Sequence, residues 1–160
     1  MGEMMSELEA ILAFPTHIYT VEKPEFVEKV RERGLRSLAG QKPDNDIYPV
    51  VMSGPLEAEP RIQDFCAYVA ITAGNILTDQ GYKTDGMGAY FQSLWLQEHH
   101  KHSGMDQHTH PGALMVGFYF LDVPEGSPAA TFFDPRAGKV ATGPDEANAQ
   151  NMVARRKLKW

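Results

Sequence analysis

Cysteine is nearly absent from this chain of 160 residues. Its single thiol, Cys66, excludes an internal disulfide, and the cysteine content gives no sign of an oxidising compartment. Cys66 also falls on an apolar stripe with no His or basic residue close in sequence to lower the pKa of its thiol. We therefore expect a buried, unreactive thiol and not a nucleophile.

Long apolar runs and a basic face are also missing. No stretch reaches the roughly 18 apolar residues that a membrane span needs, and the N-terminus lacks the basic flank and apolar run of a signal peptide. The net charge is −6, and the 15 Lys and Arg residues are scattered except for the cluster at 155–159. We therefore expect a cytoplasmic protein whose partners include neither a membrane nor a nucleic acid.

The length and the hydrophobic content of 42% fit one domain with one core. We expect a single domain over 1–160, divided into an N-terminal extension (1–13), a strand plus two helices (14–86), a β core (87–144) and a tail or edge element (145–160). The last segment is charged and Ala-rich without alternation, so a helix, an edge strand and a tail all stay open for it.

Proline and glycine mark the helices of the N-terminal half. A short β-rich run at 14–21 precedes Pro24, which opens a helix that ends near Gly40. A second helix is expected over 61–79, stopped by Gly81. Its apolar stripe consists of Ile62, Phe65, Cys66, Val69, Ile76 and Leu77.

Aromatic and branched residues dominate the chain from Met87 onward. Three segments, 88–97, 113–123 and 129–135, have the composition of β-strands and are bounded by turn residues. The middle segment is apolar on both faces, which favours a strand inside a two-layer sheet or barrel. Helices followed by strands predict an α+β fold, with helices against one side of a β-sandwich or barrel.

Five of the six histidines lie between residues 99 and 112. Imidazole is the commonest side-chain ligand for transition metals, and chelation needs ligands that converge. His108 and His110 are two residues apart, so in an extended strand they project from the same face about 7 Å apart. We expect this pair to bind a metal ion, with a structural pair as the alternative.

A third ligand is needed to complete such a site. Asp106 is two residues before His108 and shares its face if the segment is extended, which matches the two-histidine, one-carboxylate triad of non-haem iron enzymes. A sharp bend before Pro111 would undo this alignment. His99, His100 and His102 alternate around Lys101, whose charge opposes a metal, and we expect them to form a solvated polar loop.

Other metal-binding patterns fit less well. Cupins place an acidic residue four or five positions after the second His, where this chain has Leu114 and Met115. Metallo-β-lactamases need a further Asp-His pair, where Pro111 and Gly112 stand. The same two-histidine pattern occurs in amidohydrolases, but their barrel needs about 250 residues and this chain has 160.

The segment "H-T-H-P-G-A-L-M-V-G-F-Y-F-L-D-V-P-E-G", followed by "F-F-D-P-R", resembles a family of 2-oxoglutarate/Fe(II)-dependent oxygenases common in marine bacteria and their phages. The opening "F-P-T-H-I-Y" is similar to the start of that family. The resemblance spans about residues 14–136 and is most specific over 108–136.

The resemblance implies a double-stranded β-helix, a jelly-roll-like barrel, with the N-terminal helices packed outside and its C-terminal strands incomplete. It implies Fe(II) at His108 and His110, where the wider superfamily has Asp at the second position. It also implies 2-oxoglutarate beside the metal, near the aromatic pair Tyr119 and Phe120. A phenol at the second of these positions would contact the cosubstrate, so Phe120 weakens that contact.

The chain departs from the family after the Asp-Pro-Arg turn. The family's distal His ligand and its 2-oxoglutarate-binding Arg have no counterpart before Trp160. Two hypotheses follow: a dioxygenase-like protein that uses O₂ to hydroxylate an unknown small-molecule or protein substrate, or a noncatalytic β-helix module, such as a phage structural or accessory protein. No catalytic residue is assigned. Exposed strand edges favour a homo-oligomer, in the host cytoplasm if a phage encodes the protein.

Overall fold

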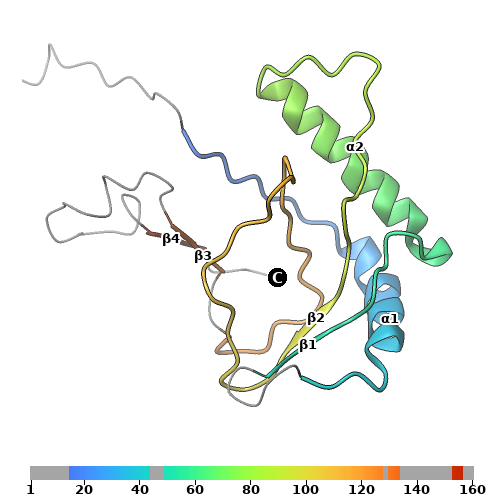
Figure 1. Cartoon of the computed structure of the whole chain (residues 1–160), viewed down its shortest axis with the longest axis vertical. Coiled ribbons are helices and arrows are strands. Elements are labelled where there is room, and N and C mark those ends of the chain that lie inside the picture. Colours follow the sequence, from blue (N-terminus) through green and yellow to red (C-terminus); the bar gives the residue numbers. More distant parts are fainter. Residues whose placement is uncertain (1–14, 44–48, 128–129, 134–152, 157–160) are drawn as a thin grey trace, which may run out of the picture. The chain divides into compact units, whose positions relative to one another are not determined.

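The computed structural model describes residues 15–43, 49–127, 130–133 and 153–156. The chain divides into a central unit, Lys23–Asp122, and a terminal unit that joins residues 1–22 to residues 123–160. The central unit contains both helices and one β ladder, and the terminal unit contains a second ladder (Figure 1).

The first helix begins at a proline, as predicted. A 3-10 turn, η1 (Pro24–Phe26), runs directly into α1 (Val27–Leu38). Proline suits this position because its φ is already helical and the first N–H of a helix has no partner. The buried face of α1 repeats every four residues at Val30, Gly34 and Leu38. Gly40 follows the helix at φ 83°, a left-handed conformation that glycine adopts at no steric cost.

The second helix also confirms its prediction. η2 (Pro60–Ile62) leads into α2 (Gln63–Asp79). Glu59 caps the start, because its side chain accepts a hydrogen bond of 3.2 Å from the backbone N–H of Arg61. Gly81, at φ 89°, follows the last turn.

The core of the central unit forms where the two helices meet. Ile62 is fully buried, and the predicted stripe residues Phe65 and Cys66 are buried with it. These residues pack together with Val30 and Leu56. Partly buried apolar side chains surround them: Phe26, Val69, Phe91, Leu94, Leu96, Tyr119 and Leu121. The residues after α2 thus complete the core that the helices begin.

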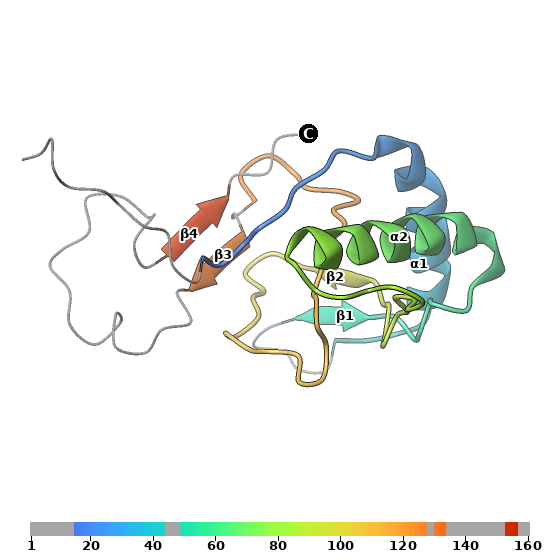
Figure 2. The ribbon, with the colours of Figure 1, turned by 90° about the horizontal axis from the view of Figure 1, so that it is seen from above.

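A short antiparallel ladder joins β1 (Val50–Met52) to β2 (Gln97–His99). Val51 pairs with Glu98 at its centre. Hydrogen bonds extend the pairing beyond the strands, from Ser53 N to Leu96 O at 2.9 Å and from Leu56 N to Leu94 O at 2.8 Å. Figure 2 shows this ladder beneath the two helices. It fixes the chain just before the histidine-rich segment.

The terminal unit contains β3 (Ala130–Phe133) and β4 (Val153–Arg156), which pair antiparallel. β3 lies inside the strand predicted at 129–135. β4 shows that part of the segment 145–160, whose structure the sequence left open, is a strand. Residues 1–14, 44–48, 128–129, 134–152 and 157–160, which include the predicted N-terminal extension and most of the predicted tail, are outside the described ranges.

The predicted double-stranded β-helix is wrong. Within the described residues, the sheets are two separate two-stranded ladders, and neither closes into a barrel. The segment 113–123 forms no strand, and the described part of 14–21 forms none either. Of the predicted strand 88–97 only Gln97 belongs to a ladder. Leu114 is 85% exposed and Phe118 is 64% exposed, so the segment expected inside a barrel lies largely at the surface.

The error has a physical origin. An apolar, β-branched run indicates a preference for burial and extension, but a strand forms only where partners satisfy its backbone groups. Neither described ladder includes 113–123, and of its side chains Tyr119 and Leu121 pack against the core of the described residues. Neither described helix is long and apolar enough to cross a membrane.

Candidate metal site

His108 and His110 lie together in the central unit. Their ring centroids are 5.0 Å apart, and the rings meet edge to face at 73°. No strand holds them, because residues 108–110 are irregular and a turn at Pro111 and Gly112 follows. The backbone of this turn is closed by a hydrogen bond of 3.2 Å from Ala113 N to His110 O. The predicted pair therefore lies in an irregular segment just before a turn, and not in a strand.

A backbone contact fixes the tautomer of His108. Its Nδ1 lies 2.7 Å from the carbonyl oxygen of Asp106, an acceptor only, so Nδ1 carries the proton and donates it. Nε2 then has a free lone pair. A hydrogen bond from one ring nitrogen to a backbone carbonyl is the usual way in which proteins orient a metal-binding imidazole. This contact leaves Nε2 of His108 available as a donor atom for a ligand or ion.

Trp95 packs beside the second histidine. Its ring centroid is 5.7 Å from that of His110, with an angle of 45° between the planes. Both residues are half-buried, whereas His108 is exposed. The indole shields one side of His110 and limits the orientations of its ring. Sequence reasoning missed Trp95, because nothing in the spacing of the residues indicates that position 95 lies beside position 110.

Asp106 contacts the pair differently from the expectation. It meets His108 through its backbone carbonyl, and the extended strand that was to align its carboxylate with the histidines is not present. Among the described residues, no group of three or more His, Cys, Asp or Glu side chains is arranged to hold a metal ion. The described site therefore supplies two ligands, and a bound ion would take its remaining ligands from water or other molecules.

The other three histidines are exposed, as predicted: His99 ends β2, and His100 and His102 belong to the turn that follows. His100 Nε2 lies 3.1 Å from the carboxylate of Glu98. His99 Nδ1 lies 3.2 Å from the hydroxyl of Ser103, and His102 has a left-handed backbone with φ 68°. These contacts occupy the ring nitrogens of His99 and His100 locally, so they do not add to the pair at 108 and 110.

The two residues expected near a cosubstrate have other contacts. The Tyr119 ring lies 4.8 Å from that of Phe65, and its hydroxyl donates a hydrogen bond to the carbonyl of Lys23. Burial, together with the carboxylate of Glu25, raises the pKa of this phenol. Phe120 stacks with Phe118 at 6.2 Å. Tyr119 is thus engaged in the core, and its role toward a cosubstrate stays a prediction.

Cys66 matches the expectation of an unreactive thiol. It is buried, and burial raises the pKa of the thiol above its usual value of 9.0, helped by the carboxylates of Glu57 and Asp64. A thiol held in the protonated form is a poor nucleophile and a poor metal ligand. The chemistry available in the central unit therefore rests on the imidazoles.

The donor set fits a borderline transition-metal ion such as Fe(II), Zn(II) or Co(II). Imidazole nitrogen suits all of these ions, and two neutral imidazoles leave open positions for exchangeable ligands. No described contact places a residue to bind the carboxylates of 2-oxoglutarate beside His108 and His110. No known protein family matches the chain, and neither a curated protein nor a solved structure matches it.

Proposed function

We propose that this chain binds a divalent transition-metal ion through His108 and His110, and that the ion serves Fe(II)- and 2-oxoglutarate-dependent hydroxylation. One observation carries the metal site: His108 Nδ1 donates to the Asp106 carbonyl at 2.7 Å, which leaves Nε2 free beside the ring of His110. The reaction class is supported by the resemblance of 108–136 to the oxygenase family.

In this proposal the residues around the two histidines bind the ion or orient its ligands. His108 and His110 hold the ion, and the Asp106 carbonyl orients the first imidazole. Trp95 restricts the second imidazole and excludes water from one of its faces. A bound Fe(II) with 2-oxoglutarate and O₂ supplies an oxidant strong enough for C–H hydroxylation.

The reaction class is tested by succinate formation. Full-length protein is incubated with Fe(II), 2-oxoglutarate, ascorbate and O₂, and succinate is measured with and without protein. Turnover that is lost in His108→Ala and kept in the matched control His102→Ala is the expected result, because His102 belongs to the exposed turn. Succinate formation that is absent, or equal in wild type and His108→Ala, overturns the oxygenase assignment.

An exposed apolar run favours a second candidate, a noncatalytic module that assembles with copies of itself. Leu114, Val116 and Phe118 are all exposed within one short segment, and exposed apolar surface of this kind is typical of protein contacts. Sedimentation velocity tests this function. Wild type is expected to self-associate and Phe118→Ser to remain monomeric, whereas Ile71→Ser, which changes an exposed residue on α2, keeps the association. A wild type that is monomeric at all concentrations excludes this candidate.

A further inference from the structure

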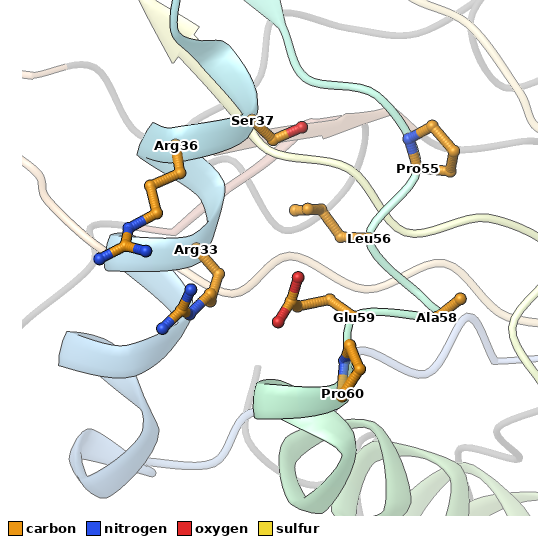
Figure 3. A pocket seen from close by; sticks show the side chains of 8 residues that line it. All are labelled: Arg33, Arg36, Ser37, Pro55, Leu56, Ala58, Glu59 and Pro60. Atoms are coloured by element: carbon orange, nitrogen blue, oxygen red, sulfur yellow. The ribbon is translucent and has the colours of Figure 1, made fainter.

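An open pocket lies between the second half of α1 and the loop that leads into η2. Its volume is about 420 Å³, within the range of small-molecule sites. Figure 3 shows its two walls. One wall is α1, with Arg33, Arg36 and Ser37, and the other is the loop around Leu56 and Glu59.

The Arg33 side chain lies largely covered at the helix wall of this pocket. It is only 10% exposed, although arginine side chains are rarely buried without a close partner. Its ion pair within the described residues is with Glu32 Oε1 at 3.6 Å, longer than a hydrogen bond. The same oxygen accepts a hydrogen bond of 2.7 Å from Arg36. Glu32 is thus engaged by Arg36, and the Arg33 guanidinium, none of whose nitrogens is buried without a partner, has donors left for solvent or a ligand.

Glu59 brings the opposite charge to the facing wall. Its Oε1 accepts the capping hydrogen bond from Arg61 N, and Figure 3 shows the carboxylate directed across the pocket toward α1. No ion pair within 4.0 Å joins Glu59 to Arg33 in the described structure. The two walls therefore carry opposite charges, Arg33 on α1 and Glu59 on the loop, which a ligand in the pocket could contact separately.

The remaining lining sets the character of a ligand between these charges. Apolar side chains complete the loop wall: Pro55, Leu56, Ala58 and Pro60. Leu56 is buried and belongs to the core, so this wall is fixed in place. The hydroxyl of Ser37 adds one further polar group on the helix side.

We propose that this pocket binds a free α-amino acid with an apolar side chain. The carboxylate of the amino acid pairs with the Arg33 guanidinium, whose fork matches a carboxylate. The ammonium pairs with Glu59, and the side chain lies on the proline- and leucine-lined wall. A ligand with only a negative charge would be repelled by Glu59, and one with only a positive charge by Arg33, so the two walls together select a zwitterion.

The test compares three ligands on the full-length wild-type protein by NMR titration. L-leucine carries both charges, leucinamide lacks the carboxylate, and N-acetyl-leucine lacks the ammonium. L-leucine is expected to shift the resonances of Arg33, Ser37 and Leu56 saturably. Each derivative is expected to bind at least about tenfold more weakly, the equivalent of about 1.4 kcal/mol. No shifts at these residues with L-leucine, or equal binding of all three ligands, overturns the proposal.

Matched variants assign the two charges to their residues. Arg33→Met keeps the apolar stem and removes the guanidinium, and Glu59→Gln removes only the negative charge; each is expected to weaken L-leucine binding at least about tenfold. Arg31→Met is the control, because Arg31 lies on the same helix, outside the pocket, and pairs with Asp122 at 3.5 Å. Equal weakening by Arg31→Met and Arg33→Met contradicts a specific role for Arg33.

Discussion

Gly34 of α1 lies directly against Leu96, the residue that precedes β2. A Cβ atom on Gly34 would stand 2.3 Å from Leu96 Cδ1 and 3.0 Å from Leu96 Cβ. The helix and the segment leading into the ladder therefore approach as closely as they do because position 34 has no side chain. This contact ties α1 to the segment that leads into β2 and the histidine-rich turn.

Gly34→Ala is expected to destabilise the protein, although alanine is the better helix former. Overpacking against Leu96 costs about 1–3 kcal/mol, more than the helix-propensity gain of at most about 1 kcal/mol. Urea unfolding measures the difference. Gly74→Ala is the control, because a Cβ at Gly74 of α2 meets nothing within 4 Å, and it is expected to stabilise the protein. Stabilisation by both substitutions would contradict the close approach.

Tyr119→Phe separates a structural role from a role in binding a cosubstrate. The hydroxyl of Tyr119 donates to the Lys23 carbonyl, and its loss is expected to cost about 0.5–1.5 kcal/mol of unfolding free energy. Tyr90→Phe, at a residue that is 88% exposed, is expected to change it by less than about 0.5 kcal/mol. Unchanged stability with weakened 2-oxoglutarate binding would instead support the cosubstrate role.

The Cys66 thiol is expected to react slowly with alkylating reagents in the native protein. Its burial requires local opening before reaction, so labelling should be at least about tenfold slower than in denaturant. Burial raises the pKa of this thiol in the folded protein. The contribution of the protonated thiol to the free energy of unfolding is therefore complete below pH 9.0, and it is lost as the pH rises through the higher pKa of the folded state. A Cys66→Ala protein that carries Ser93→Cys, at an exposed position, provides the fast-labelling control. Equal rates for the two native thiols would contradict the buried placement.

The ion pair between Lys29 and Asp64 links α1 to α2. The hydrogen bond from the Lys29 ammonium lowers the pKa of the Asp64 carboxyl below 3.8, as does the bond from Phe65 N. The stabilisation is therefore present above pH 3.8 and is lost as the pH falls through the lower, folded value. An NMR titration of the carboxyl is expected to show this pKa rise in Lys29→Met and stay the same in Lys42→Met. An Asp64 pKa that does not change in Lys29→Met would refute the link.

The helices could be predicted because their signals are local. The stripe through Ile62, Phe65 and Cys66, and the glycines at 40 and 81, lie within the segments that they define. The ladder between β1 and β2 depends on pairing residues that α2 separates in sequence, and no pattern within either strand specifies that partner. The apolar run at 113–123 was wrongly predicted as a strand for the same reason, because no pattern within the run specifies a pairing partner.

The candidate site also has features that the sequence predicted and features that it did not. The spacing of His108 and His110 indicated the pair, and the structure brings the two rings together. Trp95 precedes the β1–β2 ladder strand and His110 follows it, and the two rings meet because the chain turns back after the ladder. The spacing of residues in the sequence does not encode this contact. Asp106 acts through its carbonyl oxygen, a group that every residue has. The predicted role of its carboxylate as a metal ligand stays a prediction.

Metal titration of the full-length protein and its histidine variants tests the central claim most directly. Calorimetry with Co(II), which stands in for Fe(II) without oxidising in air, is expected to give one ion per wild-type chain. His108→Ala and His110→Ala should each weaken binding at least about tenfold, while His99→Ala and His100→Ala bind as wild type does. Equal affinity in wild type, His108→Ala and His110→Ala would contradict the account, as would equal weakening by His99→Ala.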